Sequence, residues 1–422
     1  MNIQLFNPPN FYYSGLHYRM MPPLGLPIIS SLLRDAGHHT EVVDLEALEV
    51  TPDMLIQAFI KQKDTWPDVI GLTALTVTAR GACESIRALR EAGFDKRIIV
   101  GGVHATLMPD EAQTWGADLV VTGECEGNIV DIFEGDAEGL IAGERMPIED
   151  IPIPDWDHHN PGISTYWGNT SLIRPNPGIT MWTRGCPFSC IFCANTIFGG
   201  QRTRYRPPEN IEEELKELQR QGCKKLYVYD DELVGTKLPD GWMKEVADRI
   251  EPLGFTWVTQ GRCNKRFITP ELMKDVKRAG CRTIFWGVES FSEKVLKAVK
   301  KHTTVEDIWH TLRVSREAGI ENGVFTMIGN YTEAEEDLAI TRDGIAKAYN
   351  EGLIQYRQTT FCDAVEGTEY AEIQKREGWY HKWTEKDNQM MNNHYGTPTL
   401  PNDRFEFWMR EFHKACPPGI PA

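Results

Sequence analysis

The sequence lacks any apolar run approaching the length of about 20 residues that a membrane-spanning helix requires. Its opening residues, MNIQLFNPPN, also lack the basic segment and following apolar stretch of a secretory signal peptide. Basic residues are in the minority, with 45 lysines and arginines against 61 aspartates and glutamates and a formal net charge of −16. We therefore expect a cytoplasmic protein without membrane contact. The charge also disfavours nucleic acid as a partner, since phosphates require a basic face.

Seven of the ten cysteines are scattered along the chain, and we expect them to be small buried apolar residues. The other three stand close together in the loop GCPFSCIFC, residues 185–193, directly after an expected strand. In a cytoplasmic chain of this size, such a tight group indicates metal more often than disulfides.

The spacing of the three cysteines favours one kind of metal centre. Thiolates are soft ligands that bind zinc or iron–sulfur clusters. Structural zinc takes four protein ligands, usually as two separated pairs, and no second pair follows this loop. Cys186, Cys190 and Cys193 on a four-iron cube would leave one iron open for a ligand from outside the protein. We therefore expect an oxygen-sensitive [4Fe–4S] cluster, with structural zinc and a chance grouping of buried cysteines as the alternatives.

A chain of 422 residues predicts two or three domains. Residues 1–135 alternate short apolar runs with amphipathic stretches, which predicts a doubly wound, Rossmann-like α/β domain with a parallel sheet. Its expected strands are Ile3–Phe6, Thr40–Val43, Val69–Thr73, Ile98–Val100 and Leu119–Thr122. Residues 136–177 are dense in proline, aspartate, asparagine and glycine, which predicts a linker.

A second alternating series covers residues 178–372 and predicts a partial (β/α)6 barrel, whose chemistry would lie at the carboxyl ends of the strands. The expected strands are Gly178–Thr183, Lys225–Tyr229, Thr256–Gln260, Thr283–Gly287, Gly323–Ile328 and Gln355–Phe361. Residues 373–422 are rich in aromatic side chains and show no clear period. We expect this last segment to cover the open edge of the barrel.

The cysteine loop resembles the signature of the radical S-adenosylmethionine (SAM) superfamily, with Phe192 at its usual aromatic position. The resemblance extends from residue 178 to about residue 370 and implies that SAM binds the open iron of the cluster and yields a 5′-deoxyadenosyl radical. Polar residues after successive strands are similar to the family's SAM-binding positions, namely Tyr229, Asp230, Asp231, Arg262, Glu289 and Ser290. Taken singly, the two aspartates could cap a helix and Glu289 could be a surface acid. Their order after successive strands favours SAM binding.

One turn departs from the family pattern. Residues 329–333, GNYTE, replace the turn common after the fifth strand, which indicates an unusual substrate. Just past the sixth strand, Cys362 is a candidate for acting on substrate, although a lone cysteine is more often a packing residue.

Small and polar residues also mark the strand ends of the first domain, where they let a large ligand approach the backbone. Their order resembles the cobalamin-binding domain of one branch of the superfamily and implies contacts from Pro9, Leu24, Thr73, Gly101, Gly102, Val103, His104, Gly123, Glu124 and Glu126. The Asp-x-His-x-x-Gly motif that supplies a histidine beneath cobalt in other cobalamin proteins is absent. We expect cobalamin without a protein ligand below cobalt, rather than ligation by His104. The rival interpretation is a domain that keeps this shape without needing cobalamin.

The resemblance implies a cobalamin-dependent C-methyltransferase that acts on an unactivated carbon of a small molecule. It also implies a low-potential electron donor such as flavodoxin or ferredoxin. Two alternatives remain open. One is a radical cyclisation, ring contraction or rearrangement without net methyl transfer, and the other is a cobalamin-binding or redox sensor without turnover.

Overall fold

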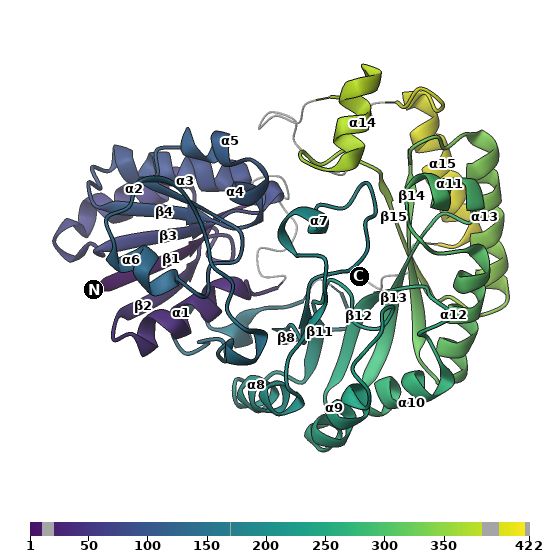
Figure 1. The fold of residues 1–422 in the computed structure, drawn as a ribbon. Helices are drawn as coiled ribbons and strands as arrows, with labels where there is room; N and C mark the ends of the chain where they lie inside the picture. Colours follow the sequence, from purple (N-terminus) through teal and green to yellow (C-terminus); the bar gives the residue numbers. More distant parts are fainter. Residues whose placement is uncertain (11–20, 169, 382–395, 418–422) are drawn as a thin grey trace. The chain divides into compact units, whose positions relative to one another are not determined.

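The computed structural model describes residues 1–10, 21–168, 170–381 and 396–417, which form two compact units (Figure 1). The first unit comprises Met1–Asn169, Pro175–Ile179 and Glu217–Cys223, and the second comprises Thr170–Arg174, Thr180–Lys216 and Lys224–Ala422. In the described ranges, no helix combines the length and the apolar character needed to cross a bilayer.

The first unit is built on a seven-stranded sheet in the order β6-β5-β4-β3-β1-β2-β7, and its paired strands run parallel. The strands are β1 (Asn2–Asn7), β2 (His39–Asp44), β3 (Val69–Thr73), β4 (Arg97–Gly101), β5 (Leu119–Thr122), β6 (Gly139–Ala142) and β7 (His159–Asn160). The helices are α1 (Gly25–Asp35), α2 (Pro52–Lys61), α3 (Ala79–Glu91), α4 (Val103–Leu107), α5 (Pro109–Gln113) and α6 (Ile129–Glu134).

Apolar residues on alternate sides of β4 join two different cores. Ile98 and Val100 belong to the core that includes Phe59 of α2 and residues of α3. Ile99 belongs to the core that includes Leu33 of α1 and Phe133 of α6. Both faces of the sheet are therefore covered by helices, as in a doubly wound domain. The predicted Rossmann-like fold is confirmed.

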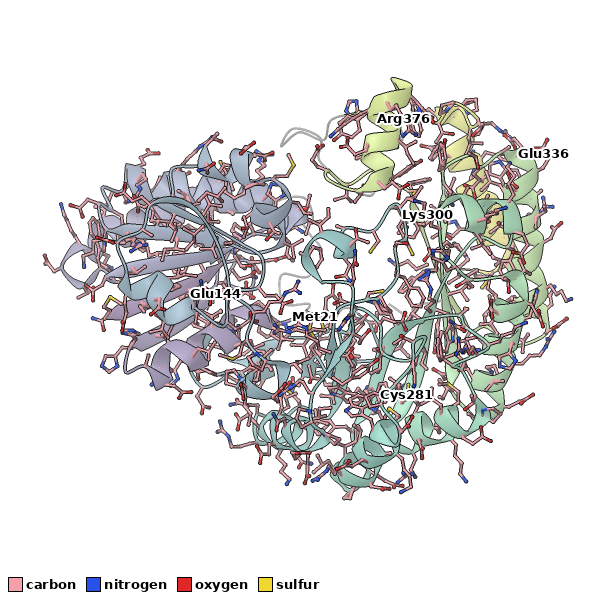
Figure 2. The ribbon with its side chains drawn as sticks, in the orientation of Figure 1. Met21, Glu144, Cys281, Lys300, Glu336 and Arg376 are labelled. Carbon is pink, nitrogen blue, oxygen red and sulfur yellow. The ribbon has the colours of Figure 1, made fainter. Side chains whose placement is uncertain are left out.

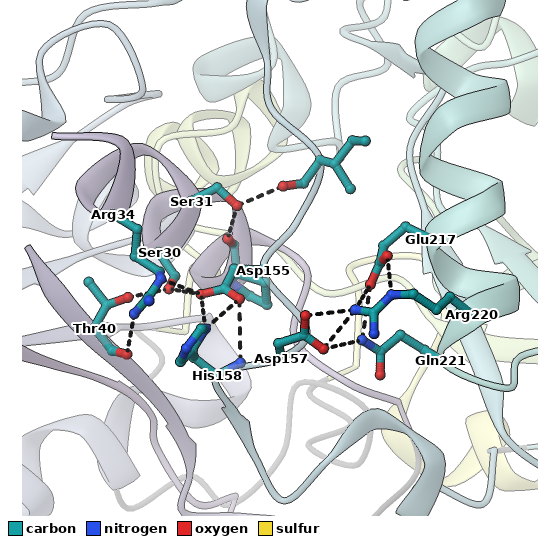
Figure 3. Close-up of polar contacts among 12 residues, drawn as sticks. Ser30, Ser31, Arg34, Thr40, Asp155, Asp157, His158, Glu217, Arg220 and Gln221 are labelled. Carbon is teal, nitrogen blue, oxygen red and sulfur yellow. Dashed lines mark hydrogen bonds and ion pairs between the residues drawn. The ribbon is translucent and has the colours of Figure 1, made fainter. Parts of the chain in front are cut away.

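The segment expected to be a linker instead contributes β6 and β7 to this sheet, β6 pairing with β5 and β7 with β2. β6 is a mostly exposed edge strand and β7 has two residues, so no buried apolar period marks either in the sequence. Polar contacts fasten the segment to α1. Ser30 Oγ donates to Asp155 at 2.7 Å, and Ser31 Oγ donates to the carbonyl oxygen of Ile153 at 2.6 Å (Figure 3).

A second sheet has six strands in the order β15-β14-β13-β12-β11-β8. The strands are β8 (Pro177–Thr180), β11 (Lys225–Val228), β12 (Thr256–Arg262), β13 (Cys281–Glu289), β14 (Glu321–Ile328) and β15 (Tyr356–Phe361). The helices between them are α8 (Pro208–Arg220), α9 (Trp242–Ile250), α10 (Pro270–Arg278), α11 (Glu293–Ala298), α12 (Val305–Glu317) and α13 (Glu335–Asn350). Parallel strands that alternate with helices confirm the predicted partial (β/α)6 barrel.

Hydrogen bonds distinguish the two faces of this sheet. Trp257 Nε1 donates to the carbonyl oxygen of Ala279, the residue after α10, at 2.7 Å. Asn322 accepts from Trp286 Nε1 at 2.8 Å and donates from Nδ2 to the carbonyl oxygen of Leu312, in α12, at 2.9 Å. These side chains mark the outer face, toward the helices. Because side chains alternate along a strand, the residues next to them in β12, β13 and β14 lie on the inner face.

Two helices follow the second sheet, α14 (Glu369–Glu377) and α15 (Asn402–Ala415). Trp408 of α15 donates from Nε1 to Glu335 of α13 at 2.8 Å, and the rings of Phe405 and Phe361 lie 5.4 Å apart. α15 therefore packs on α13 and β15, at the edge of the sheet. The expected boundary after residue 372 falls inside α14, and residues 382–395 and 418–422 of the expected cover segment lie outside the described residues.

Candidate active site

The cysteine loop connects β9 (Thr183–Arg184) to α7 (Asn195–Phe198) and begins at a glycine that no other residue could replace without strain. Gly185 has φ +91°, and a Cβ there would lie 2.4 Å from the carbonyl oxygen of Arg202. Its backbone N–H donates to Asp231 Oδ2 at 2.8 Å. Further along the loop, Ile191 donates from its N–H to the carbonyl oxygen of Val299 at 3.2 Å. Two backbone N–H groups therefore anchor the loop, one at its first residue and one between Cys190 and Cys193.

The raised pKa values of the thiols are compatible with thiols that lose their protons only when iron binds them. Cys190 is 8% exposed, and burial raises the pKa of Cys186 to about 12 and also raises the pKa of Cys193. Such thiols stay protonated at neutral pH until a metal displaces the proton. Within the described ranges, no three His, Cys, Asp or Glu side chains are grouped to hold a single metal ion.

Arg262, at the end of β12, lies against the cysteine loop. Its Nη1 and Nη2 atoms are 3.4 and 3.3 Å from Cys190 Sγ, and its guanidinium carbon lies 3.8 Å from the centre of the Phe188 ring. Arg262 is 3% exposed, and among the described residues its Nε has no hydrogen-bond partner. A buried guanidinium beside sulfur stabilises a thiolate and leaves a donor available for a further acceptor. The contact of Arg262 with SAM remains a prediction.

The acidic residues after β11 bind protein groups. Asp230 is fully buried, accepts from Trp182 N and Thr183 Oγ1, both at 2.8 Å, and has its pKa raised to about 8 by burial. Asp231 holds Gly185, as described above. Glu232, which the sequence did not single out, accepts from the backbone N–H of Arg262 at 3.3 Å. These three carboxyl groups therefore join β11 to the cysteine loop and to β12.

Tyr229 and Phe192, two further residues predicted to bind SAM, differ in exposure. Tyr229 is 54% exposed, and its ring lies 5.4 Å from that of Tyr227. Phe192 is partly buried and packs against an apolar cluster that includes Ile191 and Tyr370. Both contacts with SAM remain predictions.

Glu289 forms a buried ion pair that no motif in the sequence predicts. Its Oε1 lies 2.7 Å from Lys301 Nζ, and the two side chains are 9% and 8% exposed. Burial opposes the charge of Lys301, but Glu289 outweighs it and raises the pKa of the ammonium. Glu289 has φ +60° and follows a bulge between β13 and β14. Ser290 instead exchanges a hydrogen bond with Thr341 Oγ1 at 2.8 Å, toward α13.

The turn after β14 is held by its own carboxylate. Glu333 accepts from the backbone N–H groups of Gly329 and Asn330 at 2.8 and 3.1 Å, and burial raises its pKa to about 7. Cys362 is buried in the apolar cluster with Ile191 and Tyr370, and burial raises its pKa well above the ordinary value. A neutral thiol is a poor nucleophile, so the structure favours packing, and action of Cys362 on substrate remains a prediction. The adjacent Asp363 has a buried Oδ2 with no hydrogen-bond partner in the part of the chain that the structure describes, and burial raises its pKa to about 8.

The predicted cobalamin-binding residues of the first unit gather after strands of one parallel sheet. Gly102 has φ +98°, and a Cβ there would lie 2.7 Å from Thr73 Oγ1. Gly123 has φ +79°, and nothing lies within 4 Å of its Cβ position. Carboxyl ends of parallel strands meet at one edge, where ligands of such folds bind. A tight backbone at Gly102 with open space at Gly123 fits a large ligand at that edge.

Most of the other residues predicted to bind cobalamin also follow strands of this sheet, and Leu24 packs in an apolar cluster. Pro9 follows β1, and its carbonyl oxygen would lie 1.9 Å from a Cβ on Gly81 of α3. Leu24 packs against the cluster of Ile28, Ile148 and Ile151. Val103, which begins α4, follows Gly101, the last residue of β4, and Glu124 and Glu126 follow β5.

His104 lies inside the core. It is 3% exposed, and its ring stacks on Trp115 at 5.6 Å with an interplanar angle of 12°. Its Nδ1 lies 3.4 Å from Thr76 Oγ1 and its Nε2 lies 3.4 Å from Glu111. An imidazole held this way supports the expectation that His104 does not ligate cobalt.

Comparison with protein families gives two matches in this order along the chain. The B12 binding domain matches residues 18–133, and the radical SAM superfamily matches residues 180–343. The chain therefore belongs to the radical SAM superfamily. More particularly, it belongs to the branch in which a cobalamin-binding domain precedes the radical domain, as its motifs predicted.

Known proteins resemble the chain over most of its length. An uncharacterized methyltransferase of Pyrococcus horikoshii, PH0819, is 27% identical over 378 residues, which are 83% of this chain and 78% of that protein. An anaerobic magnesium-protoporphyrin IX monomethyl ester cyclase of Rubrivivax gelatinosus is 24% identical over 384 residues, 84% of this chain and 67% of that protein. The structure of the cobalamin-dependent SAM radical enzyme OxsB, with aqua-cobalamin and SAM bound, superposes with a TM-score of 0.72 at 17% identity, covering 97% of this chain and 66% of that one. It shows a shared fold.

Proposed function

We propose that the protein is a cobalamin-dependent radical SAM methyltransferase that adds a methyl group to an unactivated carbon of a small molecule. The observation that carries the proposal is the cysteine loop, with three thiols and the guanidinium of Arg262 against one of them, in a chain that also has a B12-binding domain. The methyltransferase PH0819 supports the methyl-transfer part of the proposal.

The residues have distinct parts in this function. Cys186, Cys190 and Cys193 would hold the cluster, and Arg262 would stabilise the charge on Cys190 and offer its unpaired Nε to an anionic group. Lys301 and Glu289 would present a fixed pair of charges beside the bound SAM. When bound, the cluster and SAM would supply a 5′-deoxyadenosyl radical, and cobalamin would supply a transferable methyl group. The carboxyl groups after β11 would help to hold the cysteine loop in place through their bonds to Trp182, Thr183 and Gly185.

Two further parts of the proposal concern partners. The substrate is a small molecule, and a low-potential protein such as flavodoxin or ferredoxin supplies electrons. The magnesium-protoporphyrin cyclase favours, as a second candidate function, a radical cyclisation or rearrangement without net methyl transfer. The third candidate is a cobalamin-binding or redox sensor without turnover.

The test is product analysis after anaerobic reconstitution with iron and sulfide, addition of cobalamin, SAM and a low-potential reductant, and mass spectrometry. Methyl transfer by this route gives 5′-deoxyadenosine together with S-adenosylhomocysteine, the latter only with cobalamin. Rearrangement gives 5′-deoxyadenosine alone, and a sensor gives neither. A wild type that assembles no four-iron cluster, or that cleaves SAM no faster than the triple variant described next, would refute the proposal.

Matched cysteine variants distinguish loss of the cluster from loss of the folded structure. The triple variant Cys186→Ala, Cys190→Ala, Cys193→Ala should lose the cluster and all 5′-deoxyadenosine. Cys281→Ala is the control, because Cys281 is a buried cysteine at the first residue of β13 (Figure 2), whereas Glu289 is the last residue of that strand. It should keep both the cluster and SAM cleavage.

A further inference from the structure

The inner face of the second sheet carries a group of aromatic rings that the chemistry above does not use. Trp286 and Asn322 mark the outer face, so Phe285 of β13 and Phe325 of β14 lie on the inner face. The rings of Phe285 and Phe325 are 5.3 Å apart with an interplanar angle of 21°, and that of Tyr356 in β15 lies 6.2 Å from Phe285 at 30°. We call these three side chains the inner aromatic face.

A glycine makes room for this arrangement. Gly323 is opposite Phe285 in the register of β13 and β14. A Cβ at Gly323 would lie 2.3 Å from Cδ1 of the Phe285 ring, so any other residue there would displace the ring. Across three strands, the sequence therefore builds a set of nearly parallel rings. Such rings attract a further flat ring by offset stacking.

Two glutamines supply polar groups beside the rings. Gln358 is opposite Phe325 in the register of β14 and β15, and it is partly exposed. Within the part of the chain that the structure describes, no hydrogen bond engages its side-chain amide. Gln260, also on the inner face, donates from Nε2 to the carbonyl oxygen of Asp230 at 3.1 Å. The amide of Gln358 is therefore a neutral donor and acceptor that remains available to a ligand.

Charged groups lie at the two ends of this face. Glu321 and Glu289 are already paired, and Arg262, at the carboxyl end of β12, lies against Cys190 of the cysteine loop. At the amino end, Glu321 accepts from Tyr356 OH and Thr283 Oγ1, both at 3.0 Å, and contacts Arg282 at 3.3 Å. At the carboxyl end, Glu289 is paired with Lys301. The positions between them hold aromatic, apolar and amide side chains. A ligand that carried a charge into this region would lose its hydration without gaining a counter-charge.

We propose that the reacting substrate of this enzyme has an uncharged, planar ring system, which stacks on Phe325 of the inner aromatic face and hydrogen-bonds through a polar edge to Gln358. The inference rests on the proposed function, since it takes the inner face of the radical domain as the place of the substrate. It adds the substrate class: a neutral flat heterocycle or arene, rather than an aliphatic chain or an ionised metabolite.

The probe is quinolin-2(1H)-one, a flat neutral ring system with an N–H and a C=O on one edge. Its binding to the full chain, reconstituted without oxygen, is measured by ligand-observed NMR titration. 2-Oxo-1,2-dihydroquinoline-4-carboxylate keeps the same rings and lactam edge and adds a negative charge, and octahydroquinolin-2(1H)-one has the same lactam without flat rings. We expect the neutral flat probe to bind at least about tenfold more tightly than either relative.

Variants then locate the binding. Phe325→Ala should weaken binding of the flat probe roughly threefold to tenfold through lost stacking. Gln358→Leu, of similar size, should weaken it roughly fivefold through one lost hydrogen bond. Tyr349→Ala is the matched control, because Tyr349 is a 42% exposed aromatic residue of the surface helix α13, and it should leave binding unchanged.

Two outcomes overturn the inference. One is equal binding of the charged or saturated probe, and the other is a loss in Phe325→Ala and Gln358→Leu no larger than in Tyr349→Ala. The formation of 5′-deoxyadenosine is measured in the same preparations without any probe. Its absence overturns the proposed radical function, whereas its presence with unselective probe binding overturns the substrate class alone.

Discussion

Replacing Lys301 with methionine should reveal how much the second unit depends on its buried ion pair. Lys301 Nζ lies 2.7 Å from Glu289, and both side chains are less than 10% exposed, at 8% and 9%. Methionine fills a similar volume but leaves the Glu289 carboxylate buried without its partner. Removing one member of a buried pair typically costs about 3–5 kcal/mol in the free energy of unfolding. We expect a loss of that size for Lys301→Met, measured by urea unfolding of the apoprotein followed by circular dichroism.

The neighbouring lysine provides the control. Lys300 also pairs with a carboxylate, Glu369, at 2.6 Å, but those side chains are 47% and 46% exposed. Lys300→Met should therefore cost less than about 1 kcal/mol. The double variant Lys301→Met, Glu289→Leu removes both buried charges and should be more stable than Lys301→Met alone. If Lys301→Met costs no more than Lys300→Met, or if the two buried substitutions are simply additive, the interpretation of this pair is wrong.

Three further substitutions test other features. The folded pKa of Asp230 is about 8 against an ordinary 3.8, so the folded state keeps a proton that the unfolded state loses, and stability should fall as pH rises through this window. Asp230→Asn should reduce that fall, measured as the change in urea midpoint between pH 5 and 8. His104→Ala should leave the absorption spectrum of bound cobalamin unchanged, while the lost contact with Trp115 lowers stability by roughly 1–3 kcal/mol. Gly185→Ala places a Cβ 2.4 Å from the carbonyl oxygen of Arg202 and should lower the iron bound per chain, with the circular dichroism spectrum as the control for folding.

The strands that could be predicted from the sequence are those with continuous buried apolar residues. β3 has the predicted bounds, Val69–Thr73, because nearly all its residues are buried. β13 was expected over Thr283–Gly287 but extends over Cys281–Glu289, since its ends are set by pairing with neighbouring strands rather than by hydropathy. β6 and β7 could not be predicted, because short edge strands carry no buried period.

In the candidate site, too, some residues could be predicted from the sequence and others could not. The cysteine spacing is a local feature, and it was enough to predict the loop. Lys301 follows Glu289 by only twelve positions, but it stands in the basic run KKHTT, which has no period that indicates burial. The backbone turns there through positive φ at Lys300 and His302, 51° and 52°, and this turn places Lys301 beside Glu289. No pattern of residue types predicts that turn.

A position after a strand therefore predicts where a polar group lies better than it predicts what the group binds. Asp230 and Asp231 follow β11 as the family pattern requires, yet their carboxyl groups bind Trp182, Thr183 and Gly185. These bonds join β11 to β9 and to the start of the cysteine loop, and contact of the two aspartates with SAM remains a prediction. In the substrate site that we propose, selectivity comes from side chains without such duties, and the amide of Gln358 on the inner face is one of these. Substrate choice can thus change on the inner face while the residues that hold the cluster loop stay the same.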